Sequence, residues 1–158
     1  MYSVNIQTST SFELGNENVA HQVLDSLLEC LVQVNVALMR SRPFPDLYGT
    51  RVRYKQESLG QENWRDAAIV LQSGYGDCED LAAYRVAELR VKHRIPARCV
   101  FRWKTFTLTN ETGRHRVKLY HILVGLQHGK TLLIEDPSKR LGMPASAPEQ
   151  TMALAGRV

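Results

Sequence analysis

Three stretches of the sequence have the hydrophobic spacing of helices that pack on one face. Between residues 17 and 40, apolar residues recur at steps of three and four, which predicts a long core helix. A second helix is expected over residues 62–71 and a third over 78–93. Pro43 follows the first helix and Pro96 the third, since proline cannot continue a helix. The first helix is defined by Val19, Val23, Leu27, Leu28, Leu31, Val34 and Leu38.

The second half of the chain shows the patterns of strands. Strands are predicted over 98–106, 117–126 and 130–135, with turns near residues 110–113 and 128–129. Short turns between consecutive strands favour an antiparallel meander. Helices followed by such a meander predict an α+β fold in one domain, residues 1–158, with the third helix packed against the sheet. The remaining segments are expected to be a strand or extended arm (1–14), a loop (43–61) and an extended tail (after Leu141).

Composition narrows the class of protein. The chain has 158 residues, 44% hydrophobic and 23% charged, with a formal net charge of +4, which are ordinary values for a soluble globular domain. The basic residues are scattered, so nucleic acid is not an expected partner. The N-terminus lacks the basic and apolar regions of a signal peptide, and no apolar run approaches the length of a membrane span. We therefore expect a soluble, cytoplasmic protein without a membrane partner.

The three cysteines do not suggest disulfides, because their number is odd and the chain is large enough to form its own core. Cys30 lies in the first predicted helix and Cys99 in the first predicted strand, each among apolar neighbours. We expect both thiols to be buried, reduced and inert.

Cys78 stands in a different setting, the run Gly74-Tyr75-Gly76-Asp77-Cys78-Glu79-Asp80. A glycine-rich turn delivers this cysteine to the first turn of the third helix, where free N–H groups and the helix dipole favour a thiolate and can later stabilise an oxyanion. Asp77 is a good N-cap, and Asp80 at N3 completes a capping box. The surrounding acidic groups raise a thiol pKa, however, so a thiolate here needs a cationic partner such as an imidazolium.

His121 is the histidine best placed to serve as that partner. It lies inside an apolar strand, where a buried imidazole needs a hydrogen-bond partner. A hairpin turn centred between residues 128 and 129 would place Asp136 directly opposite it, on the same face of the sheet. The other histidines are less suitable: His21 lies in the first helix, His93 about four turns from Cys78, and His115 and His128 in polar turns predicted to be exposed.

The Gly-Tyr-Gly-Asp-Cys-Glu-Asp-Leu-Ala run, Trp64, the segment Tyr120-His121-Ile122-Leu123-Val124 and the segment Glu135-Asp136-Pro137-Ser138 together resemble the transglutaminase-like superfamily. The resemblance covers roughly residues 60–140. Within the superfamily, the chain is most similar to the small bacterial and phage-borne cysteine peptidases. The resemblance implies a papain-like fold and a triad of Cys78 as nucleophile, His121 as general base and acid, and Asp136 as the group that orients the imidazole. It also implies attack on an amide carbonyl through a thioester acyl-enzyme. Candidates on the oxyanion or substrate side are Trp64, Tyr75 and Asp77.

Three functions follow from this resemblance and stay open at the level of sequence. The first is a cysteine peptidase or amidase acting on a protein or peptide substrate. The second is amide transfer between glutamine and lysine, in which an amine replaces water. The third is a structural or binding module, such as a component of a phage particle, and would make the protein virion-associated. No cofactor or metal is expected, because Cys and His lack ligand spacing and the acidic run would repel phosphate.

Overall fold

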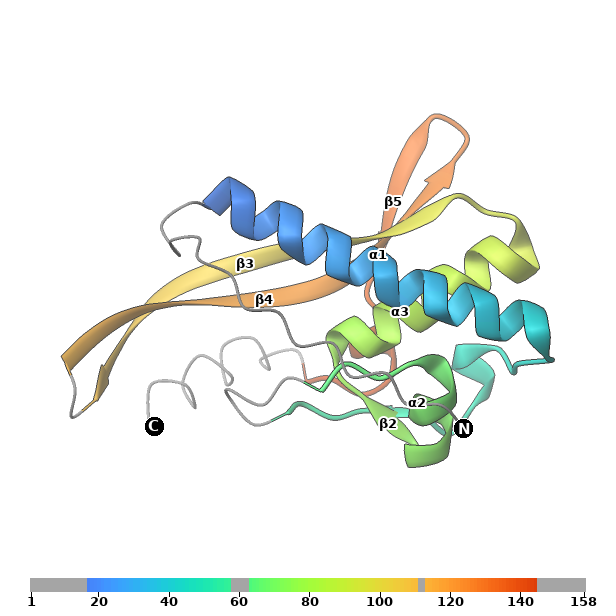
Figure 1. Ribbon diagram of the computed structural model, residues 1–158, viewed down its shortest axis with the longest axis horizontal. Helices are drawn as coiled ribbons and strands as arrows, with labels where there is room; N and C mark the ends of the chain where they lie inside the picture. The colour runs from blue at the N-terminus through green and yellow to red at the C-terminus, as the bar shows by residue number, and fades with distance from the viewer. Residues whose placement is uncertain (1–16, 58–62, 111–112, 145–158) are drawn as a thin grey trace.

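The computed structural model describes residues 17–57, 63–110 and 113–144 (Figure 1). Helical segments come first and an antiparallel sheet follows, which confirms the predicted α+β class. The predicted N-terminal strand and most of the predicted tail lie outside the described residues. The elements are α1 (Glu17–Ser41), η1 (Leu47–Gly49), β1 (Arg53–Tyr54), α2 (Ala67–Ser73), β2 (Tyr75–Gly76), α3 (Cys78–Glu88), η2 (Leu89–His93), β3 (Ala97–Asn110), β4 (Gly113–His128), β5 (Thr131–Glu135) and α4 (Pro137–Arg140).

The larger sheet is the predicted meander, with strand order β3-β4-β5 and antiparallel pairing throughout. Its first two strands are longer than expected, because the ladder continues to the pair Asn110 and Gly113. His115 consequently pairs with Leu108 within this ladder instead of lying in a turn, which corrects the prediction. His128 ends β4 and is exposed, as predicted.

A second sheet was not predicted. The segment expected to be a loop, 43–61, contains β1, which pairs in parallel with β2 through Arg53–Tyr75 and Tyr54–Gly76. Two-residue strands carry too little alternation to be recognised in a sequence. This pairing matters for the site because β2 leads directly into α3.

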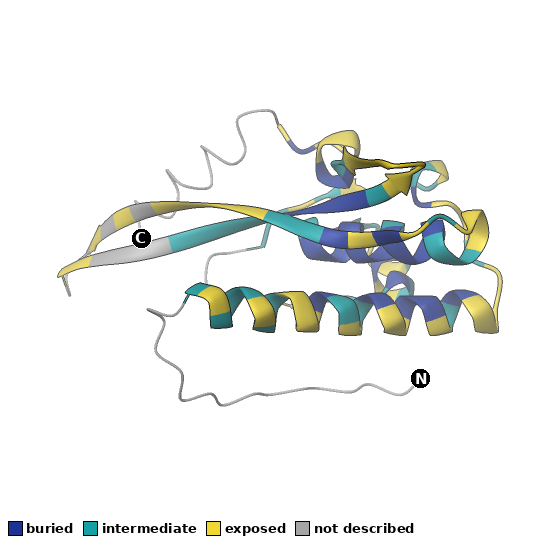
Figure 2. Ribbon diagram, turned by 90° about the horizontal axis from the view of Figure 1, so that it is seen from above, coloured by how far each residue is buried: buried dark blue, intermediate teal, exposed yellow. Residues whose placement is uncertain are grey.

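The core lies between α1, α3 and the sheet. Figures 1 and 2 show α1 running along one face of the β3-β4 ribbon beside α3. Helix α3 is almost entirely enclosed, with Leu81, Ala82 and Tyr84 fully buried. It is shorter than the predicted helix 78–93, because the chain continues from Leu89 as the π-helical segment η2. Likewise α2 begins at Ala67, later than predicted, because Asp66 caps it there.

Helix α1 corrects two expectations. Its length and composition are sufficient to cross a membrane, contrary to the prediction that no such run exists. Its buried residues form one face against the rest of the protein. Cys30 lies on the other side of α1 and is exposed, so the prediction of a buried thiol is wrong for Cys30, whereas Cys99 is buried as predicted.

Candidate active site

The turn between α2 and α3 depends on two glycines. Gly74 ends α2 in the left-handed region, with φ of 76°, where a side chain would be strained. Gly76 lies so close to the next helix that an added Cβ would stand 3.0 Å from the Cβ of Asp80. The glycines therefore permit the sharp approach that places Cys78 in the first turn of α3.

A capping box fixes the start of α3, as the sequence predicts. The Asp77 side chain accepts a hydrogen bond from the backbone N–H of Cys78 at 2.7 Å, and Asp80 Oδ2 accepts one from the N–H of Asp77 at 3.2 Å. Asp80 also accepts from the backbone N–H of Arg65 at 2.7 Å. Because the Cys78 N–H is already bonded to Asp77, it is not the free oxyanion donor that was expected.

The Cys78 thiol is half-buried and surrounded by acidic groups. Its sulfur lies 3.4 Å from Glu79 Oε2. Burial raises the pKa of the Cys78 thiol well above its usual value, and the charges of Glu79 and Asp77 raise it further. The backbone of Ile122, beside His121 in β4, acts in the opposite direction through a hydrogen bond to the sulfur. The thiol therefore lies against the strand that carries the candidate base.

His121 and Asp136 are joined by the predicted hydrogen bond. Nε2 of His121 lies 3.0 Å from Oδ2 of Asp136, and the two side chains are 12% and 17% exposed. Asp136 Oδ1 accepts from the backbone N–H of Lys139 at 3.1 Å, so the carboxylate also caps α4. Burial opposes ionisation, but these hydrogen bonds from His121 and Lys139 hold the pKa of Asp136 below its usual value. With Nε2 engaged by the carboxylate, Nδ1 remains to exchange a proton with a thiol.

The register that brings these residues together differs from the predicted one. Val124 pairs with Glu135, whereas the predicted register would pair it with Leu133. Asp136 therefore lies beyond the end of β5 and is not directly opposite His121, which pairs with Arg102 on β3. A shift of two residues keeps every side chain on its face, because strand side chains alternate with a period of two. The predicted contact is therefore formed even though the predicted register is wrong by two residues.

The three candidates on the substrate side lie around the same turn. Trp64 is half-buried and packs against the core before α2. The centroid of the Tyr75 ring lies 4.4 Å from the Lys55 ammonium and 5.2 Å from the Arg65 guanidinium. Asp77 accepts from the N–H of Glu57 at 2.9 Å in addition to capping α3. The turn is thus tied to the segment that follows β1.

Tyr54 is a neighbour of the thiol that sequence reasoning missed. Burial raises the pKa of its hydroxyl strongly, and Asp77 and Cys78 raise it further. A hydrogen bond to Asp77 contributes to the same shift. Only the unpredicted β1-β2 pairing, which sets Tyr54 beside Gly76, brings this tyrosine to the site.

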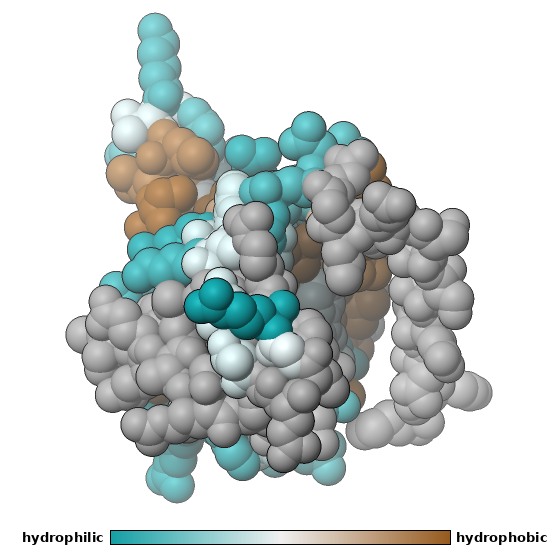
Figure 3. Space-filling view, turned by 90° about the vertical axis from the view of Figure 1, so that its left-hand side faces the viewer, coloured by the Kyte–Doolittle hydropathy of each residue, from teal (hydrophilic) through white to brown (hydrophobic). Residues whose placement is uncertain are grey.

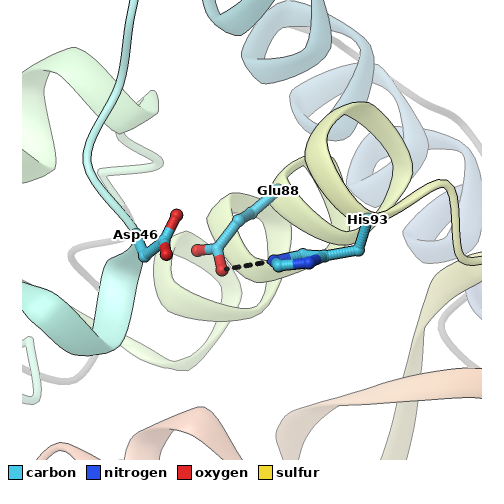
Figure 4. Close-up of side chains that lie close together, drawn as sticks. All are labelled: Asp46, Glu88 and His93. Carbon is cyan, nitrogen blue, oxygen red and sulfur yellow. Dashed lines mark ion pairs between the residues drawn. The ribbon is translucent and has the colours of Figure 1, made fainter.

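A second group of titratable side chains lies at the other end of α3. Figure 4 shows Asp46, Glu88 and His93 directed toward one another, with an ion pair of 3.6 Å between His93 and Glu88. Their ligand atoms lie within 4.8 Å, a spacing that a metal could use. However, Asp46 bonds Lys92 Nζ at 2.5 Å and Glu88 bonds Arg85, so cationic side chains already neutralise both carboxylates.

The site itself is the other described group with metal-ligand spacing, since donor atoms of Asp77, Cys78 and Glu79 also lie within 4.8 Å of one another. Three consecutive residues of one helix start are held there by capping and local hydrogen bonds. The arrangement is accounted for by the fold of the turn and does not require an ion.

Comparison with protein-family models, curated proteins and solved structures finds no match to this chain. The transglutaminase-like resemblance therefore rests on the motifs of the sequence. A papain-like fold and a catalytic triad stay predictions.

Proposed function

We propose that the protein is a cysteine-dependent hydrolase of a protein or peptide amide, with Cys78, His121 and Asp136 as its catalytic residues. The observation that carries the proposal is the His121–Asp136 hydrogen bond of 3.0 Å on the strand whose next residue, Ile122, contacts the Cys78 sulfur. A thiol at a helix start, an imidazole and an orienting carboxylate are the groups that acyl transfer needs.

In the proposed reaction, His121 takes the proton of the Cys78 thiol and the thiolate attacks the amide carbonyl carbon. The resulting tetrahedral intermediate collapses as the imidazolium gives its proton to the leaving amine, which leaves a thioester on Cys78. Water, deprotonated by His121, then attacks the thioester and releases the acid and the thiol. Asp136 holds the imidazole in one orientation and stabilises its protonated form.

The electrostatics of the site give His121 a second task. Asp77 and Glu79 disfavour a thiolate at Cys78, whereas an adjacent imidazolium favours one. An imidazolium at His121 is the cation that would offset these charges in the proposed reaction, so thiolate and imidazolium are expected to form as a pair. Thiol reactivity should then depend on His121 as much as on Cys78.

The exposed Cys30 provides an internal reference for testing this pair. We expect iodoacetamide to alkylate Cys78 faster than Cys30 near neutral pH, as resolved by peptide mass spectrometry, although Cys78 is the less exposed thiol. His121→Ala should slow Cys78 and leave Cys30 unchanged. An activated ester such as p-nitrophenyl acetate should deposit an acetyl group on Cys78, and an added primary amine that captures it would favour amide transfer over hydrolysis. If Cys78 reacts more slowly than Cys30 and is indifferent to His121→Ala, the proposal fails.

A further inference from the structure

Strand β5 exposes three consecutive large apolar residues. Leu132, Leu133 and Ile134 are 48%, 45% and 56% exposed. Because successive side chains of a strand point to opposite faces, both faces of β5 are uncovered. Figure 1 shows the β4-β5 hairpin projecting from the body of the molecule, and Figure 3 shows a hydrophobic patch below its hydrophilic tip. Such a patch on a projecting element is typical of an interaction surface.

The exposed patch also lies on an edge of the sheet. Within the described residues, β5 pairs with β4 alone, so its outer row of N–H and C=O groups has no strand partner. The opposite edge strand, β3, is protected by charge, since Arg98, Arg102 and Lys104 are exposed along it. Proteins commonly place charges on edge strands to prevent pairing with another chain. Strand β5 has no charge from Thr131 to Ile134 and lacks this protection.

We propose that β5 is a dimerisation edge, which pairs in antiparallel fashion with β5 of a second copy of this chain to form a continuous six-stranded sheet. Antiparallel pairing of identical strands places a two-fold axis perpendicular to the sheet, so one residue must lie opposite itself. With Leu133 on the axis, Leu132 lies opposite the partner's Ile134. A register centred one residue earlier sets Ile134 opposite the partner's Lys130, and one residue later sets Leu132 opposite the partner's Asp136. Only the Leu133 register pairs each of the three apolar residues with an apolar residue, and it sets Thr131 opposite the partner's Glu135.

The charges flanking the strand favour the same orientation. Lys130 precedes β5 and is exposed, and within the described part of the chain it forms no ion pair. Glu135 ends the strand and is 22% exposed, although it also pairs with Arg85. Antiparallel pairing brings the basic end of one strand to the acidic end of the other, whereas parallel pairing would juxtapose like charges. A second copy therefore complements β5 in both charge and apolar pattern.

The interface is small, because each copy contributes a strand of five residues. Its buried area should be at the low end of the range for specific interfaces, so the dimer should dissociate on dilution. Sedimentation velocity of the full chain from roughly 10 µM to 1 mM should therefore show a reversible shift from monomer to dimer. A monomer at every concentration, or a larger open-ended assembly, would overturn the proposal.

Two variants distinguish pairing through β5 from non-specific association of exposed apolar residues. Leu133→Lys places like charges on the two-fold axis and should abolish the dimer. Val34→Lys is the matched control, because Val34 is 48% exposed, close to the 45% of Leu133, but lies on α1. It should leave the dimer unchanged. A dimer that persists in Leu133→Lys, or one lost equally in Val34→Lys, would contradict pairing through β5.

Cross-linking tests the register directly. In a chain with Cys30 and Cys78 replaced by alanine, Leu133→Cys should form an intermolecular disulfide readily on mild oxidation, because the two Cβ atoms lie about 5 Å apart across the axis. Thr131→Cys is the control on the same face of the strand, and its partner residue lies four residues away, roughly 13 Å along the strand. Equal cross-linking of the two variants, or cross-linking of Thr131→Cys alone, would refute this register.

Discussion

The chemistry of Cys78 is decided by a few neighbouring atoms. Its location at the start of α3 favours a thiolate, but burial and the acids Asp77 and Glu79 oppose one and raise the thiol pKa. The helix dipole is weakened further because the Cys78 N–H already bonds the Asp77 carboxylate. His121 is therefore the group on which reactivity depends in the proposed function, and Asp136 holds it.

Asp136→Asn tests this dependence at the level of one atom. Asparagine also caps helices well, so α4 should still form, although the stability that the ionised carboxylate supplies at neutral pH is lost. The rate of acylation of Cys78 should fall by at least about 100-fold, because the amide can no longer stabilise an imidazolium. Stopped-flow kinetics with an activated ester would measure the loss.

Asp66→Asn is the matched control, since Asp66 caps α2 through the N–H groups of Ala68 and Ile69 but lies outside the site. It should leave acylation unchanged.

The low pKa of Asp136 also fixes how its contribution to folding stability changes with pH. Its stabilising effect is present above the unfolded pKa of the carboxyl and is lost as pH falls through the lower folded value. An Asp136→Asn rate equal to that of the wild type would contradict the role assigned to the carboxylate.

At the scale of elements, long periodic segments were predictable and short or tertiary features were not. The helix over 17–40 and the three strands of the meander were found from their spacing, because each repeats its pattern over several turns or pairs. The exposure of Cys30 was missed, since the helix has apolar residues on more than one face and Val34 and Leu27 are exposed as well. The β1-β2 pair was missed because two residues define no period.

Glu88 makes contacts between elements that no local sequence pattern predicts. It is buried near the end of α3, where Oε2 accepts from the N–H of Leu47 in η1 at 2.7 Å and the carboxylate pairs with Arg85. Arg85 in turn bonds Glu135 at the end of β5 at 2.8 Å. Glu88→Ala should therefore destabilise the protein by about 3 kcal/mol, because it leaves a buried N–H without its acceptor and a guanidinium without one of its carboxylates.

Urea denaturation would measure this loss. The control is Asp46→Ala, which removes a neighbouring carboxylate of the same cluster (Figure 4) that is exposed and pairs with Lys92. Exposed ion pairs contribute little, so this variant should unfold near the wild-type midpoint. Equal effects of the two substitutions would show that the cluster acts through surface charge and not through burial.

At the scale of the whole molecule, the approach of His121 to Asp136 could be predicted because both lie on one hairpin, where an error of two residues preserves the face. The approach of Tyr54 could not, since it depends on packing between segments more than 20 positions apart in the sequence. The same holds for Arg65, which bonds Asp80 and Glu57 and so joins the segments on either side of β2. Long-range contacts between polar residues have no periodic signature.

Asp80 links this network to global stability and gives it a pH dependence. Burial raises the pKa of Asp80 to about 6, despite the hydrogen bonds it accepts from Arg65 and Asp77. A carboxyl with a raised folded pKa stabilises the native state below its unfolded pKa, and this contribution is lost as pH rises through the folded value. Asp80→Asn keeps an acceptor and removes the titration. The unfolding free energy of the wild type should therefore fall relative to that of Asp80→Asn by about 2–3 kcal/mol between about pH 3.5 and 7.5. Urea titrations of both proteins across this range measure the difference, and parallel curves would show that Asp80 ionises in the folded protein as it does in the unfolded chain.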